Sequence, residues 1–166
     1  PRDPPVDAPE GDLAAPVTPP LRGERPRLTL VIPTTLRRNA FGGITTGLDI
    51  FFRLATELRR NGPLDLRVLQ TGPEDVEPDN AAARIAFRLG LDPAEISFEP
   101  RFYKGSALRT RSAEIFMPFN WYCADNLLDV VAAQQKTFGG PRRPLVYPVQ
   151  EYEPNFYPMS SDQLLA

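Results

Sequence analysis

The chain has 166 residues, of which 42% are hydrophobic and 24% are charged, and its formal net charge is −2. These values are typical of one soluble globular domain and give no electrostatic reason to expect nucleic acid or an anionic membrane as a partner. Histidine is absent and Cys123 is the single cysteine. Catalytic triads, imidazole bases, histidine-ligated metals, cysteine zinc sites and internal disulfides are therefore excluded, and Cys123 is expected to be a small buried apolar residue.

Residues 1–26 differ in composition from the rest of the chain. They contain eight of the 20 prolines and few large apolar residues. Such a segment buries too little surface to offset its ordering entropy, so we expect an extended Pro-rich arm. The arm could lie on the domain or on a second copy of the chain, which would make it a means of self-association. The apolar side chains that would make these contacts are Val6, Leu13, Val17 and Leu21.

Strands and helices are expected to alternate after Pro26. Apolar, β-branched runs predict five strands, at residues 27–33, 64–69, 96–98, 113–118 and 144–149. Apolar residues at helical spacing predict helices at residues 44–58, 80–89 and 125–138, each followed by a glycine. Near-continuous apolar strands that alternate with helices are typical of βαβ units. The predicted fold is therefore a three-layer, Rossmann-like α/β domain with a parallel sheet of about five strands.

Polar residues near the predicted helix starts suggest where these helices begin. Thr45 or Thr46 is the expected cap of the first helix, with Asp49 as the acid of a capping box. Asp125 is the expected cap of the third helix.

The end of the chain suggests a fragment. Residues 160–162 begin a further helix that the chain does not complete, so we expect the domain, residues 27–166, to be truncated just after Tyr157. No apolar run approaches the ~20 residues of a membrane span, and no signal-peptide pattern is present. A cytoplasmic location is expected.

Two glycines follow the first predicted strand. In open parallel sheets, ligands bind beyond the carboxyl ends of the strands. Gly42 and Gly43 would let backbone amides approach a phosphate or a sugar hydroxyl at a helix start. The alternative is that they only permit a tight turn. Neither a dinucleotide-binding fingerprint nor a P-loop is present.

Aromatic and polar residues follow the fourth and fifth predicted strands. Asn120 and Trp121 could bind and stack on a sugar, or could form a packed aromatic collar under the next helix. The segment after the fifth strand contains Gln150, Glu151, Tyr152 and Glu153. Its polar groups favour ligand contact, with a solvated acidic turn as the alternative. An acidic metal site is disfavoured because no second acidic cluster lies nearby.

Two motifs resemble one known family. They are Phe41-Gly-Gly-Ile-Thr45 and Gln150-Glu-Tyr-Glu-Pro-Asn-Phe-Tyr-Pro158, the latter followed by Ser160-Ser161 and Leu164-Leu165-Ala166. They resemble the N-terminal half of bacterial rhamnosyltransferases of glycosyltransferase family 4, enzymes of surface-glycan synthesis, and the resemblance covers about residues 27–166. The family usually has Asp where this chain has Glu151.

The resemblance implies half of a GT-B fold and a role in sugar transfer. This half would bind the glycan acceptor, with Gly42 and Gly43 lining the cleft, and a C-terminal half would bind a nucleotide sugar, typically dTDP-rhamnose. No metal or other cofactor is expected, and Glu151 and Glu153 are the available candidate catalytic carboxylates. Two alternatives stay open: a non-catalytic scaffold module that docks a partner through the Pro-rich arm, and a small nucleotide-binding regulator, which the missing phosphate motifs disfavour.

Overall fold

A computed structural model describes residues 24–35, 42–72, 78–103, 105–141 and 145–148. Most of the predicted Pro-rich arm and its four apolar contacts lie outside these residues. The elements in chain order are β1 (Arg27–Ile32), α1 (Gly42–Arg59), β2 (Asp65–Gln70), α2 (Pro78–Leu89), a 3-10 turn (Pro93–Glu95), β3 (Ile96–Glu99), β4 (Glu114–Pro118), α3 (Trp121–Asp125) and α4 (Leu128–Phe138).

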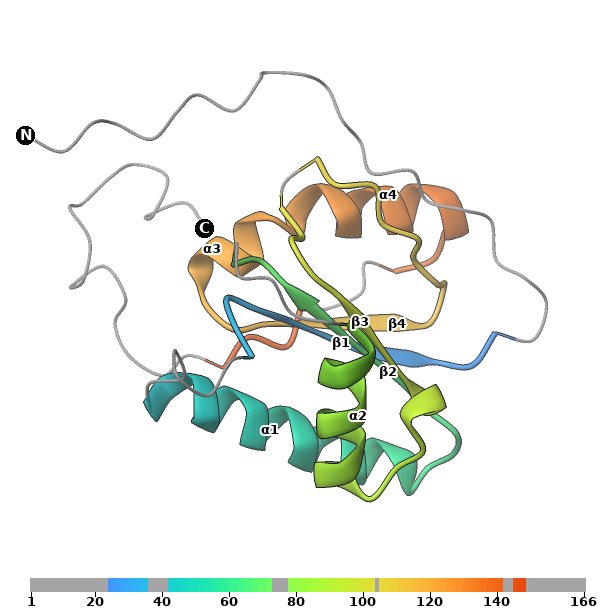
Figure 1. The fold of residues 1–166 in the computed structure, drawn as a ribbon. Helices are drawn as coiled ribbons and strands as arrows, with labels where there is room; N and C mark the ends of the chain where they lie inside the picture. Colours follow the sequence, from blue (N-terminus) through green and yellow to red (C-terminus); the bar gives the residue numbers. More distant parts are fainter. Residues whose placement is uncertain (1–23, 36–41, 73–77, 104, 142–144, 149–166) are drawn as a thin grey trace, which may run out of the picture.

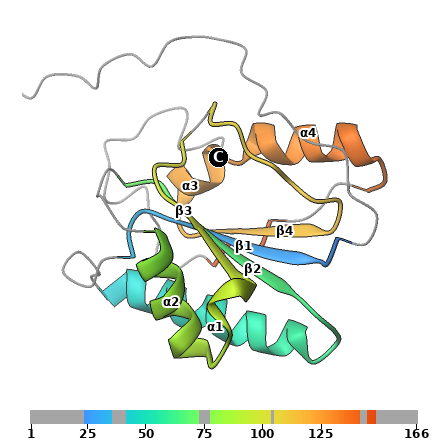
Figure 2. The same ribbon diagram turned by 45° about the vertical axis from the view of Figure 1, so that its right-hand side comes forward.

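The strands form a parallel sheet between two layers of helices. Their order across the sheet is β3-β2-β1-β4, and every adjacent pair is parallel. Helices α1 and α2 cover one face, and α3 and α4 cover the other (Figures 1 and 2). The predicted three-layer, Rossmann-like α/β fold is confirmed.

The predicted fifth strand is reduced to one bridge in the part of the chain that the structure describes. Leu145 forms an isolated parallel bridge with Phe116 of β4, and the Val146 amide donates to the Phe116 carbonyl at 2.9 Å. The sheet therefore has four strands there rather than five. Prolines at positions 144 and 148 lack the backbone donors that a longer ladder would need.

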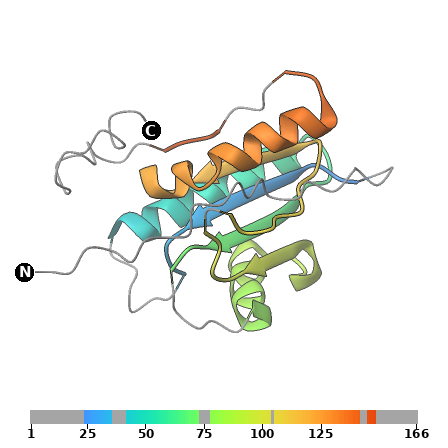
Figure 3. The ribbon, with the colours of Figure 1, turned by 90° about the horizontal axis from the view of Figure 1, so that it is seen from above.

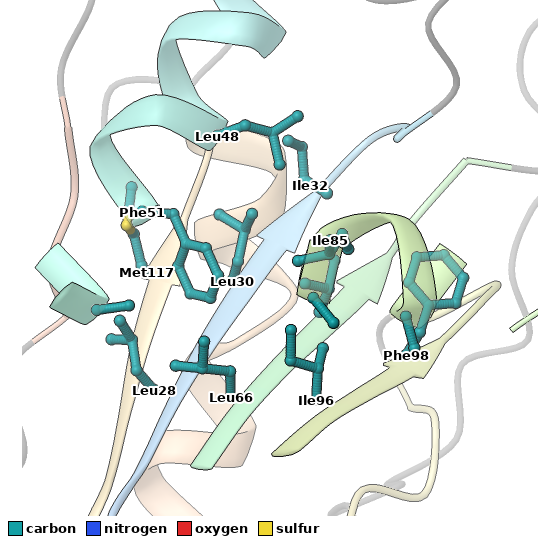
Figure 4. Close-up of a cluster of buried hydrophobic side chains, with 14 of the residues drawn as sticks. Leu28, Leu30, Ile32, Leu48, Phe51, Leu66, Ile85, Ile96, Phe98 and Met117 are labelled. Carbon is teal, nitrogen blue, oxygen red and sulfur yellow. The ribbon is translucent and has the colours of Figure 1, made fainter. Parts of the chain in front are cut away.

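The larger apolar core lies between the sheet and helices α1 and α2 (Figure 4). Every second residue of β1 faces this core, and Leu28, Leu30 and Ile32 are fully buried. Helix α1 contributes residues at helical spacing, among them Leu48 and the fully buried Phe51. This packing explains why the first helix could be predicted from its apolar period.

The opposite face is apolar toward the carboxyl ends of the strands. Val31, Leu69 and Phe116 pack there against Leu127 of the turn between α3 and α4. Cys123 is fully buried in the same cluster, as expected from the sequence. The connection from β3 to β4 crosses this face without a helix in its described residues, and Figure 3 looks onto it with α4 beside it.

Both predicted helix starts with polar caps are wrong. Helix α1 already begins at Gly42, so Thr45 and Thr46 are exposed residues inside its first turns, and Asp49 is no capping-box acid. Buried Ile44 anchors this first turn to the core, which outweighs the low helix propensity of glycine. Asp125 is the last residue of α3 rather than a cap.

The true start of α3 is set by a different residue. Asn120 has extended backbone angles, and its side-chain oxygen accepts a hydrogen bond from the Cys123 amide at 2.9 Å. Asparagine is among the preferred N-cap residues for this reason. The chain turns at Asn126 and Leu127, and α4 begins at Leu128 with no side-chain cap.

Candidate functional site

The direction of chain growth across the sheet reverses between β1 and β4. From β1 the chain adds β2 and then β3 on one side, and it then returns to place β4 on the other side of β1. In open α/β sheets, ligands bind outside the carboxyl ends of the strands at such a switch point. The carboxyl edge of β1 and β4 is therefore the candidate site, and we call it the switch-point edge.

The structure brings two of the predicted segments to the switch-point edge. Gly42 and Gly43 open α1, which follows β1, while Asn120 and Trp121 follow β4. The two helices start at the same edge from opposite faces of the sheet (Figure 1). The first turn of α1 contains no acidic residue, so no carboxylate on that turn offsets the partial positive charge of the helix start.

The two residues predicted after β4 take different roles. The Asn120 oxygen is used as the N-cap of α3. Trp121 is half-buried, and its ring meets that of Tyr122 edge-on, with centroids 6.0 Å apart. The Tyr122 side chain is 45% exposed, so it offers the larger free aromatic surface at this edge.

The predicted segment that contains Gln150, Glu151, Tyr152 and Glu153 lies outside the described residues. The described chain reaches Pro148, shortly after the bridge that Leu145 makes with β4. The roles assigned to these four residues stay predictions from the sequence.

A buried residue on the strand next to the switch-point edge was missed by sequence reasoning. Gln70, the last residue of β2, is fully buried, and its side-chain oxygen accepts hydrogen bonds from the Thr35 amide at 2.9 Å and the Thr35 hydroxyl at 3.1 Å. Its backbone carbonyl accepts from the Phe102 amide at 2.8 Å. The available signal was a polar residue directly after the strand predicted at residues 64–69.

A buried charged cluster lies on the sheet face that α4 covers, near the amino ends of the strands. The sequence alone did not indicate this cluster either. Its centre is the fully buried carboxylate of Glu114, at the start of β4. Arg27 donates to it at 2.7 Å, the Arg111 amide donates at 3.0 Å, and Arg67 and the Thr29 hydroxyl donate as well. The carboxylate is thus surrounded by four donors in place of water.

The arginines of this cluster also hold the connection from β3 to β4. Arg67 Nη1 donates to the Arg109 carbonyl at 3.0 Å and to Glu99 at 3.2 Å, and Arg27 donates to the Arg109 carbonyl at 2.8 Å. Burial lowers the pKa of the Arg67 guanidinium, while Glu114 opposes that shift. Because the cluster lies at the amino ends of the strands and satisfies its own charges, we assign it a structural role.

Two further properties concern the described residues. None of the helices placed by the structure is long and apolar enough to cross a membrane. Within the same residues, no group of three or more acidic or cysteine side chains is arranged to hold a metal ion.

Comparison with known proteins identifies one family. The family model described as "WsaF, N-terminal domain" matches residues 27–166, beginning at the first residue of β1. The name WsaF is linked to glycosyltransferases, so the chain is a glycosyltransferase-related module. Among curated proteins, none matches the chain.

Proposed function

The chain belongs to the WsaF N-terminal domain family, and we propose that it is the acceptor-binding half of a GT-B glycosyltransferase that transfers rhamnose to a glycan. The match over residues 27–166 carries the proposal. The Rossmann-like sheet supports it, because its switch-point edge joins the start of α1 to the aromatic start of α3.

The proposed reaction exchanges one bond to the anomeric carbon of the sugar for another. The bond to the nucleoside diphosphate breaks, an acceptor hydroxyl oxygen forms the new bond, and the hydroxyl proton passes to a carboxylate. Glu151 and Glu153 are the proposed carboxylates. A C-terminal domain would supply the nucleotide sugar, and holding both substrates in line would lower the barrier without a metal.

Apart from Asn120, which caps α3, the predicted contacts each have a proposed task in acceptor binding. The amides at Gly42 and Gly43 would bind acceptor hydroxyls, and the aromatic pair of Trp121 and Tyr122 would stack on a sugar ring. Gln150 and Tyr152 would complete the acceptor contacts. The proposed location is the cytoplasm, where a nucleotide-sugar donor is available.

A titration tests the acceptor-side assignment. The 166-residue chain is titrated with an oligosaccharide of L-rhamnose and, separately, with dTDP-rhamnose, and amide shifts are followed by NMR. We expect the oligosaccharide to shift resonances of the α1 and α3 starts. Binding of the nucleotide sugar alone would contradict the assignment.

A transfer assay on the full-length protein tests the aromatic contact. Tyr122→Ala should raise the KM for the acceptor about three- to tenfold, because one aromatic contact is lost from an exposed position. Phe87→Ala is the matched control, since Phe87 is a 90% exposed aromatic on α2, a helix of the opposite face. An equal effect of both variants would remove Tyr122 from the site.

A further inference from the structure

Gln70 occupies an apolar position of the sheet. It is fully buried, and it lies on the same face of β2 as Leu66 and Val68, which are four and two residues before it. A glutamine in such a place must satisfy its polar atoms within the protein, because water cannot reach them. Its oxygen does so by accepting two hydrogen bonds from one residue, Thr35.

Thr35 lies in the chain that leads from β1 toward Gly42 and Gly43. The start of this connection is also joined to β2 by backbone hydrogen bonds. The Thr71 amide donates to the Ile32 carbonyl at 3.0 Å, and the Gly72 amide donates to the Pro33 carbonyl at 2.7 Å. The last of these backbone hydrogen bonds is made by Pro33. The Gln70 side chain adds a contact two residues further along the chain, at Thr35.

The same residue contacts the connection that follows β3. The Gln70 carbonyl accepts from the Phe102 amide at 2.8 Å, and the Phe102 side chain packs in the cluster that contains Cys123 of α3. One residue thus joins two of the connections that border the switch-point edge. An apolar side chain would fill the same space but would leave the Thr35 amide and hydroxyl without this acceptor.

We infer that Gln70 is a positioning residue of the acceptor site, acting through Thr35 on the chain that presents Gly42 and Gly43. The inference rests on the proposed function for the identity of the ligand. A residue that only stabilises the fold would change the free energy of unfolding alone, whereas a positioning residue also changes the KM for the acceptor.

The test uses four variants of the full-length protein. Gln70→Met removes the acceptor of both hydrogen bonds, and Thr35→Val removes one of them. Thr35→Ser keeps the hydroxyl. Gln134→Met is the matched control, because Gln134 is an equally buried glutamine whose amide nitrogen donates to the Arg111 and Glu114 carbonyls at the opposite end of the sheet.

The expected result is a graded rise in the KM for the acceptor. One lost hydrogen bond should raise it about fivefold in Thr35→Val, and Gln70→Met should raise it about tenfold or more. Thr35→Ser and Gln134→Met should keep the wild-type KM, although Gln134→Met lowers the unfolding midpoint. Wild-type KM in Gln70→Met, or an equal rise in Gln134→Met, would overturn the inference.

Amide hydrogen exchange of residues 33–46 separates the two claims. If the wild-type protein transfers no sugar, the proposed function fails and exchange alone decides the inference. Faster exchange in Gln70→Met than in Gln134→Met then supports positioning by Gln70. Equal exchange in the two variants overturns it.

Discussion

The carboxylate of Glu114 offers the sharpest test of how the domain is held together. The substitution Glu114→Gln keeps the size of the side chain and removes its negative charge. Arg67 and Arg27, whose side chains are 1% and 11% exposed, then lose their buried counter-charge. Water cannot replace it at these positions, so the variant must be destabilised.

The size of the effect follows from the contacts that remain. Removing one partner of a buried ion pair costs about 3–5 kcal/mol. Arg67 keeps Glu99 and the Arg109 carbonyl, and Arg27 keeps the same carbonyl. We therefore expect the lower end of the range, about 3 kcal/mol. Since domains have about 5–15 kcal/mol of unfolding free energy, the variant still folds.

Urea denaturation measures this loss. Fluorescence of Trp121, the single tryptophan, and far-ultraviolet circular dichroism follow the transition. With a slope of about 2 kcal/mol per molar urea, a loss of about 3 kcal/mol lowers the midpoint by about 1.5 M. Glu57→Gln is the control, because Glu57 and Arg60 form an ion pair on the surface. Its expected change is within about 0.5 kcal/mol.

A double-mutant cycle decides whether the interaction is the cause. Arg67→Met removes the cation, and the variant that carries both substitutions lacks the main charge conflict. We expect the combined loss to be smaller than the sum of the single losses by about 1–3 kcal/mol. Additive losses would refute the reasoning, because Glu114 and Arg67 would then act independently.

Three further substitutions test other parts of the fold. Phe51 is fully buried, so Phe51→Ala should lower the free energy of unfolding in urea by about 3–5 kcal/mol. Phe52 is half-buried, so Phe52→Ala should lower it clearly less. Equal losses would contradict the packing of α1. Asn120→Ala removes the α3 cap and should lower the free energy of unfolding by about 1 kcal/mol. Asn120→Asp keeps a capping oxygen and should keep the wild-type stability. An equal loss in both variants would argue against the cap. Gly62 has a φ of 142°, which is unfavourable for alanine, and no atom lies near the methyl group that alanine would add. Gly62→Ala should therefore lower the thermal midpoint through backbone strain alone, worth about 1–2 kcal/mol. An unchanged midpoint would show that the turn adapts.

Apolar runs predicted the four observed strands closely, because burial on both faces leaves a strong apolar signal, but they also predicted a fifth strand that is reduced to one bridge in the described residues. Residues 64–69 were predicted for the strand observed at Asp65–Gln70. Helix starts were harder, since they depend on tertiary contacts. Ile44 extends α1 back through two glycines. The cap of α3 is Asn120, for which the sequence suggests either sugar binding or an aromatic collar under the helix, but not a cap.

The place of the candidate site along the chain could be predicted from the sequence. The buried hydrogen bonds that hold the connections beside it could not. The chain order of strands and helices was enough to expect ligand contacts after β1 and β4. The role of Gln70 depends on Thr35, 35 residues away, and that pairing follows only from the register of β1 and β2. The contact between Arg67 and Glu114 also depends on the register of the strands. The sequence therefore did not show that the two side chains meet near the amino ends of the strands.

The reach of Glu114 along the chain has a consequence for folding kinetics. Its donors Arg27, Thr29 and Arg67 lie 87, 85 and 47 residues away. Contacts across such long loops tend to form late, after β1 and β2 have paired. Loss of the carboxylate should therefore speed unfolding and leave the folding rate almost unchanged. Through this residue the sequence controls how long the domain stays folded, independently of how fast it reaches that state.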